Sequence, residues 1–177
     1  MSPETLQPLF GARRPMDKIV VRDARHDEAE LIVQMIRHMV REMASYGGHA
    51  PATDDAAWEK IAIVIAGELK GNNAKYVLAE SGNSDAIGVA GAALITLGGA
   101  FAPKKTLHIS AIYVLPQFRR GGIGGRLIAR ILDWGRAAGS ELCDLNVLSE
   151  NPAKSLYETC GFSVSEVKMV RSLLGGD

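Results

Sequence analysis

Hydrophobic residues recur every three to four positions along one stretch, which makes it the clearest helix of the chain. The apolar positions are Leu31, Ile32, Met35, Ile36, Met39, Val40 and Met43. This spacing places them on one face of an α-helix, while polar residues such as Gln34 and Arg41 fall on the other face. The pattern therefore predicts an amphipathic helix that packs on a core.

A second helix is predicted after the Tyr-Gly-Gly-His-Ala-Pro break at residues 46–51. Thr53 or Asp54 can cap its start, and a Gly-Asn-Asn run ends it after about Lys70. Residues 61–66 are apolar on every side, and such a helix must be covered on more than one face. Core packing is the plainer interpretation, and the alternative is that part of this helix lines a substrate cleft or a subunit contact.

Clusters of β-branched and apolar residues mark the strands. The strands are predicted at residues 18–24, 75–80, 86–97, 107–115, 142–148 and 162–170, with further helices at about 122–138 and 152–160. The run Gly82-Asn83-Ser84-Asp85 is a hairpin signal between the second and third strands. This order predicts an α/β (α+β) fold in which a mixed sheet carries helices on both faces.

The composition fits one compact domain without a general attraction to polyanions. The chain has 177 residues, 47% of them hydrophobic, and a formal net charge of zero. A single domain is expected over residues 16–177, whereas residues 1–15 contain three prolines and are expected to be a mobile tail. No nucleic-acid partner is expected, because any affinity for an anion must be local.

No apolar run reaches the roughly 20 residues that a membrane span needs, and no signal-peptide core is visible. A soluble, cytoplasmic protein without a membrane partner is therefore expected. The two cysteines, Cys143 and Cys160, form no CxxC pair and have no histidine at zinc spacing. They are expected to be core thiols, with no disulfide, no metal site and no nucleophilic role.

A glycine-rich turn follows the strand that ends near Val114. The residues are Arg119-Arg120-Gly121-Gly122-Ile123-Gly124-Gly125, and an amphipathic helix begins among these glycines. The first N–H groups of a helix have no internal partner and the helix dipole is positive there, so this turn is a candidate pyrophosphate site. The Walker and dinucleotide-binding patterns do not fit, because Gly-Lys-Ser/Thr is absent and the third glycine would fall on Leu127.

The pattern that does fit is R-x-x-G-x-G, occupied by Arg119, Gly122 and Gly124. With the preceding Ile112 to Pro116 strand end, and with Leu156-Tyr157-Glu158 followed by Gly161-Phe162, the chain resembles the GCN5-related N-acetyltransferases, the GNAT superfamily. The resemblance is close over residues 107–170 and covers only the order of elements over residues 18–97. It implies acetyl-CoA as co-substrate, and a mostly antiparallel sheet of six to seven strands with a splayed strand pair that holds this cofactor.

The resemblance also implies roles for individual residues. Main-chain atoms of the splayed strand would bind the pantetheine arm, at Ile112, Tyr113 and Val114. The amides of the turn would hold the pyrophosphate beside the charge of Arg119, at Arg120, Gly121, Gly122, Ile123, Gly124 and Gly125. Tyr157 would donate a proton to the leaving CoA thiolate, against the alternative of a packed tyrosine. The family's usual asparagine falls on Glu150, so the neighbouring Asn151 is either a cofactor ligand or the cap of the last helix.

The general base and the acceptor are less defined by sequence. His108 lies two residues before Ser110 on the strand and is the candidate base, unless its neighbours satisfy it within the fold. Further candidates are Glu42, His49, Asp54, Asp55 and Glu80. We expect direct acetyl transfer to a primary amine of a small molecule, with a protein N-terminus, a lysine side chain or a non-catalytic acyl-CoA-binding module as alternatives. Similar proteins commonly form homodimers, and the apolar second helix offers a surface for this.

Overall fold

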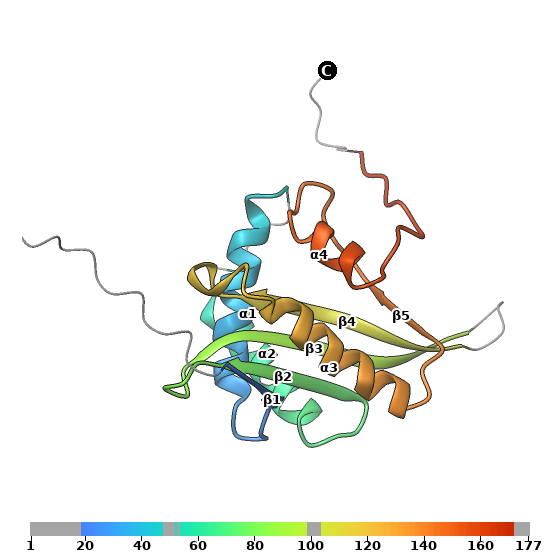
Figure 1. Ribbon diagram of the computed structural model, residues 1–177. Coiled ribbons are helices and arrows are strands. Elements are labelled where there is room, and N and C mark those ends of the chain that lie inside the picture. The colour runs from blue at the N-terminus through green and yellow to red at the C-terminus, as the bar shows by residue number, and fades with distance from the viewer. Residues whose placement is uncertain (1–18, 48–51, 53, 99–103, 172–177) are drawn as a thin grey trace, which may run out of the picture.

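The computed structural model describes residues 19–47, 52, 54–98 and 104–171 (Figure 1). The proposed mobile tail of residues 1–15 lies outside these residues, as do His49 and Thr53. In chain order the helices and strands are β1 (Val20–Asp23), α1 (Ala29–Ala44), α2 (Asp55–Glu68), β2 (Ala74–Glu80), β3 (Ala86–Leu97), β4 (Lys104–Val114), α3 (Ile123–Ala137), β5 (Leu142–Leu145) and α4 (Lys154–Thr159). A short 3₁₀ turn, Pro116–Phe118, precedes α3.

The strands form one sheet in the order β1-β2-β3-β4-β5. The first three pairings are antiparallel, and β5 lies parallel to β4. The predicted hairpin connects β2 and β3, with Ser84 in the left-handed region at φ 63° and the Ser81 N–H donating to the Asp85 carbonyl over 2.9 Å. The expected mixed, mostly antiparallel sheet is confirmed.

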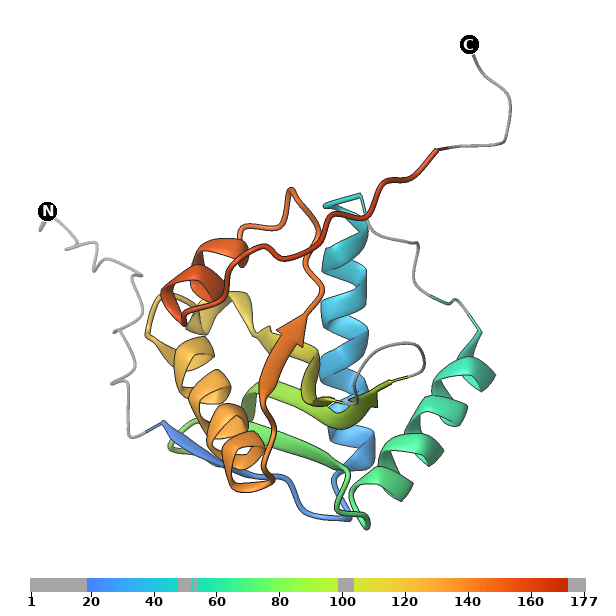
Figure 2. The same cartoon turned by 90° about the vertical axis from the view of Figure 1, so that its right-hand side faces the viewer.

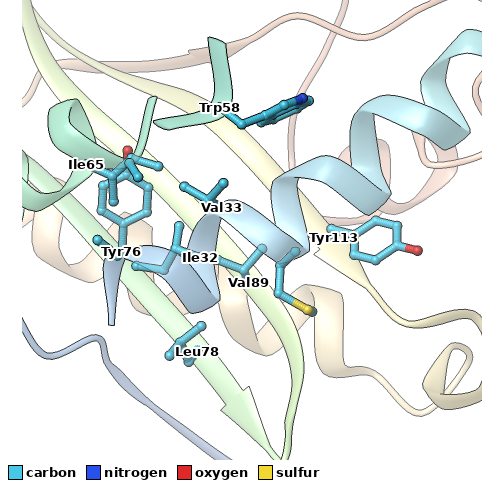
Figure 3. Packing of buried hydrophobic residues seen from close by; sticks show 11 residues of the cluster. Ile32, Val33, Trp58, Ile65, Tyr76, Leu78, Val89 and Tyr113 are labelled. Carbon is cyan, nitrogen blue, oxygen red and sulfur yellow. The ribbon is translucent and has the colours of Figure 1, made fainter. Parts of the chain in front are cut away.

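Helices cover both faces of the sheet. Figure 2 shows α1 and α2 on one side of the strands and α3 on the other. Strand β2 alternates accordingly, since Tyr76 and Leu78 join the cluster under α1 and α2, while Val77 and Ala79 join the cluster under α3. Figure 3 shows the cluster under α1 and α2. Each fully buried aliphatic side chain of these clusters stabilises the fold by about 1.5–3 kcal/mol.

Helix α2 has one covered face. The Asp54 carboxylate caps it by accepting from the Ala56 N–H over 2.9 Å, as predicted. Trp58, Ala62 and Ile65 are buried, whereas Ile63 and Val64 are 72% and 59% exposed. The core therefore covers only one side of the apolar helix α2 and leaves other apolar residues exposed. The expected subunit contact stays a prediction.

The prediction of a strand at residues 162–170 is wrong. Within the described residues the sheet has five strands and not six or seven, and residues 163–171 run without regular structure. The apolar side chains of this segment are 67–91% exposed at Val164, Val167, Met169 and Val170. Figure 1 shows the segment leading away from the sheet after α4. The alternation of the sequence describes a strand, but a strand forms only where a partner edge supplies its hydrogen bonds.

Close packing between α3 and β4 gives a first prediction. A Cβ at Gly135 would lie 2.5 Å from Cδ2 of Leu107, which is itself only 1% exposed. Gly135→Ala should therefore destabilise the protein by about 1–2 kcal/mol, because overpacking outweighs the gain in helix propensity. Gly125→Ala on the same helix is the control, since its Cβ would meet nothing within 4 Å. Chemical denaturation checks this, and a Gly135→Ala protein as stable as the control would contradict it.

Candidate active site

Strands β4 and β5 are hydrogen-bonded over only part of their length and then diverge. They pair only at Thr106–Ile109 with Leu142–Leu145. Ser110 is an extra residue in β4, because Ala92 opposes Ile109 and the neighbouring Gly91 opposes Ala111. Such a bulge bends a strand and increases its twist. Beyond it, β4 continues to Val114 and the chain after β5 takes a different path, so the expected splayed strand pair is present.

A cleft of about 520 Å³ opens between the two strands. Its walls come from the end of α1, from β4, from the glycine-rich turn and the start of α3, and from the chain between β5 and the end of α4. Of the residues predicted to bind the cofactor or to act in catalysis, the cleft is lined by Ile112, Tyr113, Val114, Arg119, Arg120, Gly122, Ile123, Gly124, Gly125, Asn151 and Tyr157. Gly121 belongs to the same turn, and His108 does not line the cleft.

The glycine-rich turn lines the cleft and has a backbone conformation suited to binding an anion. Arg120 and Gly122 both have positive φ, at 68° and 74°, on either side of Gly121. Left-handed residues in such a turn point successive N–H groups to one side and make an anion-binding nest. Gly122 is the N-cap of α3 and no side chain caps this helix. Its first N–H groups therefore remain open to an anion.

The left-handed conformation of Arg120 is uncommon for a residue with a side chain and costs about 1–3 kcal/mol. At Gly124, the second residue of α3, packing and not backbone conformation requires a glycine. A Cβ there would lie 2.7 Å from Cδ2 of Leu156, so the missing side chain lets α4 pack against the start of α3. This close packing places Tyr157, the next residue on α4, beside the turn.

Arg119 is held by the protein and does not point freely at the cleft. Its Nη1 and Nη2 donate to the two carboxylate oxygens of Glu42 at 2.8 and 2.6 Å, and its Nε donates to the Val114 carbonyl at 2.8 Å. Its guanidinium also lies 5.4 Å from the ring centre of Tyr113. The ion pair raises the pKa of Arg119 and lowers the pKa of Glu42. Of the two arginines in the turn, Arg120 is thus the one whose charge is more available to a phosphate.

Tyr157 faces the cleft from α4. Burial raises the pKa of its phenol above the ordinary value. Its ring packs edge-to-face on Phe162, with ring centres 6.2 Å apart and an angle of 73°. A phenol fixed in this way stays protonated at neutral pH and can donate a proton.

Asn151 stands at the start of the turn that precedes α4. Its side-chain oxygen accepts from the Ala153 N–H over 2.9 Å, and the residue also lines the cleft. Helix α4 itself begins at Lys154 with Ala153 as its N-cap and has no side-chain cap, so the cap expected at Asn151 is wrong. The contact of Asn151 with the cofactor stays a prediction.

His108 is paired with an aspartate that the sequence did not single out. Its Nδ1 lies 2.6 Å from Oδ1 of Asp144, directly across the β4–β5 pairing. The two side chains are 31% and 48% exposed. Each precedes a residue that lines the cleft, Ile109 and Leu145. Asp144 is the only acidic residue of β5, but its relation to His108 depends on strand register, which the local sequence does not contain.

The other candidate bases are engaged elsewhere. Asp54 caps α2, Asp55 accepts from Arg37 at 2.5 Å, and Glu80 pairs with Arg22 on the neighbouring strand. None of these three lines the cleft. Glu42 does line it, but its carboxylate is already bonded to Arg119.

Both cysteines are free thiols. Burial raises the pKa of Cys143 to about 11 and also raises that of Cys160, so neither is a reactive thiolate at neutral pH. In the described ranges no three His, Cys, Asp or Glu side chains gather closely enough to hold a metal ion. No described helix has the length and apolarity that a membrane crossing requires.

Comparison with known proteins agrees with this geometry. Residues 33–162 match the model of the acetyltransferase (GNAT) family, which is most of the chain. The chain therefore belongs to the GNAT family, whose members are acetyl-CoA-dependent N-acetyltransferases. No curated protein matches the sequence.

Several solved structures share the fold. A predicted acetyltransferase with acetyl-CoA from Clostridium acetobutylicum is 19% identical, with a TM-score of 0.71 over 89% of this chain and 97% of that one. Glucosamine-6-phosphate N-acetyltransferase from Arabidopsis thaliana is 15% identical, with a TM-score of 0.65 over 89% and 99%. AAC(6')-Iy in complex with the bisubstrate analogue CoA-S-monomethyl-acetylneamine is 20% identical, with a TM-score of 0.69 over 88% and 99%.

Proposed function

We propose that this protein transfers the acetyl group of acetyl-CoA to the primary amine of a small molecule, by direct attack within a ternary complex. The observation that carries the proposal is one cleft that joins the glycine-rich turn, the end of β4 that does not pair with β5, and the half-buried phenol of Tyr157. A CoA thioester needs these three elements in one place. The similar solved structures give support of the same kind, since one of them is a structure with acetyl-CoA.

The cofactor would lie along β4. The open N–H groups of residues 120–125 would receive the pyrophosphate, and Arg120 would add charge beside it. Main-chain groups of Ile112, Tyr113 and Val114, freed by the parting of β4 and β5, would bond to the pantetheine arm. This places the thioester against the wide part of the cleft, where a backbone N–H of β4 near Val114 would stabilise the oxyanion.

Acetyl transfer needs one proton to be removed from the acceptor amine and another to be given to the leaving thiolate of CoA. The neutral amine attacks the thioester carbonyl, and collapse of the tetrahedral intermediate forms the amide bond and breaks the C–S bond. The leaving thiolate takes its proton from the Tyr157 hydroxyl. The amine would lose its proton to His108 through water, because His108 does not line the cleft while its neighbour Ile109 does. Asp144 holds the imidazole in position.

His108→Ala should lower kcat by roughly 100-fold at neutral pH. The deficit should shrink towards about pH 9.5, where an amine loses its proton without help. Asp144→Asn should cause a smaller loss with the same pH dependence. Steady-state rates of CoA release across pH measure both. His26→Ala, which removes an exposed histidine before α1, is the control, and a His108→Ala enzyme with the pH profile of this control would remove the assignment.

The proposed activity is tested directly by incubating the protein with acetyl-CoA and a panel of amines. Release of CoA thiol, with mass spectrometry of the amide product, should show turnover for at least one small primary amine. Turnover only on peptides with free N-termini or lysines would favour a protein acetyltransferase instead. Binding of acetyl-CoA without turnover on any amine would favour a non-catalytic module.

A further inference from the structure

Residues at and just after the end of α1, together with one residue of β4, present an apolar wall to the cleft. We define this wall as Met39, Met43, Tyr46 and Tyr113, all of which line the cleft. The methionines and Tyr46 are half-buried, and Tyr113 is 8% exposed. Figure 3 shows Tyr113 at the margin of the buried cluster, with its hydroxyl pointing away from the other labelled residues. Methionine side chains adapt their shape to apolar and aromatic groups, so the wall suits a hydrophobic ligand.

The wall offers no free negative charge. Glu42 is the only acidic residue among those lining the cleft within the described residues. Its carboxylate accepts three hydrogen bonds, from Nη1 and Nη2 of Arg119 and from the Tyr46 hydroxyl at 3.0 Å. Its charge is balanced by Arg119, and Arg120 adds a further positive charge to the same cleft. A second ammonium group on the acceptor would therefore find repulsion and no partner.

The wall also has few side-chain groups that could form hydrogen bonds with an acceptor. The Tyr46 hydroxyl is occupied by Glu42, which leaves the Tyr113 hydroxyl as the wall's remaining polar side-chain group. A sugar placed against this wall brings several hydroxyl groups to it, and each one that loses water without gaining a partner opposes binding. An aromatic ring loses nothing polar and gains contact with thioether and phenol surfaces.

We infer that the acceptor is a primary monoamine carried on an apolar, aromatic body, with this body against the wall and the amine towards the thioester. The inference rests on the proposed acetyl transfer and adds the chemical class of the acceptor. It distinguishes this wall from an acceptor surface for polyamines or aminosugars, which need several carboxylates or hydrogen-bonding partners. The other polar side chains of the cleft, such as Ser110 and Asn146, lie outside the wall.

The test compares kcat/KM for three probes: 2-phenylethylamine, spermidine and glucosamine 6-phosphate. Phenylethylamine should exceed each of the others by roughly tenfold or more, since discrimination of this size follows from one unpaired charge or a few unpaired polar groups. Faster turnover of spermidine or of the aminosugar would overturn the inference while leaving acetyl transfer intact. If acetyl-CoA binds in a calorimeter but no amine is turned over, the proposed transfer itself fails and the inference fails with it.

A variant tests the wall itself. Met39→Glu should shift the ratio of kcat/KM for spermidine over phenylethylamine upwards by roughly tenfold, because it places an unpaired carboxylate where the wall was apolar. Gln34→Glu is the matched control, since it adds the same charge on an exposed position of α1 away from the cleft, and its ratio should stay that of the wild type. Met43→Glu repeats the test if Met39→Glu does not fold. A folded wall variant with the wild-type ratio would contradict the placement of the acceptor.

Discussion

Replacing Gly122 with valine is expected to raise the Kd for acetyl-CoA by roughly 100-fold, equivalent to about 2.7 kcal/mol. Gly122 has a φ of 74°, and a β-branched residue strongly resists that conformation. The backbone would relax and re-aim the N–H groups that face the pyrophosphate. A Cβ at this position would also meet nothing within 4 Å, so the new side chain would occupy the space proposed for the anion. Isothermal titration calorimetry measures the effect.

The matched control for this prediction lies at the other end of the same helix. Gly139 has a φ of 77° and its Cβ would likewise meet nothing within 4 Å, but it does not line the cleft. Gly139→Val should therefore reproduce the strain and the loss of stability while leaving the affinity for acetyl-CoA near the wild-type value. Equal loss of affinity in both variants would mean that the effect comes from the stability of α3 and not from the turn.

Tyr157→Phe is expected to lower kcat by roughly 100-fold with little change in the Kd for acetyl-CoA. The phenol acts only as the C–S bond breaks, so its loss appears in the chemical step. Because burial raises the pKa of Tyr157, the hydroxyl stays protonated up to a pH above its ordinary value of about 10. Activity that depends on it should fall only above that pH, and this alkaline limb should be missing in the variant.

Tyr76→Phe provides the comparison for Tyr157→Phe. Tyr76 is a more deeply buried tyrosine than Tyr157, its hydroxyl donates to Glu68 at 2.6 Å, and it does not line the cleft. Its replacement should lower stability by about 1 kcal/mol and leave kcat unchanged. Full-speed turnover by Tyr157→Phe, measured as single-turnover amide formation, would exclude the tyrosine as the proton donor.

The parts of the fold that local sequence can predict are those in which neighbouring residues decide the outcome. The spacing of apolar residues from Leu31 to Met43 predicts α1, and the acceptor oxygen of Asp54 predicts the start of α2. The glycine-rich turn before α3 is recognisable in the sequence because the left-handed backbone conformation at position 122 favours glycine. These features depend on contacts only a few positions apart.

The parts that sequence could not supply depend on distant pairs. Glu42 and Arg119 are separated by 77 positions, and their ion pair follows from how α1 crosses β4. The His108–Asp144 pair follows from the register of β4 and β5. The absence of the last predicted strand also depends on distant contacts, since residues 163–170 have the alternation of a strand but pair with neither edge strand of the sheet, β1 or β5.

The Glu42–Arg119 pair connects the two halves of the proposed site. Arg119 belongs to the anion-binding turn and also bonds to the Val114 carbonyl, while Glu42 belongs to the helix that forms the acceptor wall. The cofactor and the acceptor would therefore bind to elements that are held together before either arrives. Such preorganisation reduces the ordering that binding requires.

The central claim is that the backbone at the start of α3 binds the pyrophosphate of acetyl-CoA. Titration calorimetry with acetyl-CoA and with S-acetylpantetheine, which lacks the pyrophosphate, tests it most directly. We expect one acetyl-CoA to bind per chain, roughly 100-fold more tightly than the pantetheine thioester. Equal affinity for the two compounds, or no heat with acetyl-CoA, would contradict it.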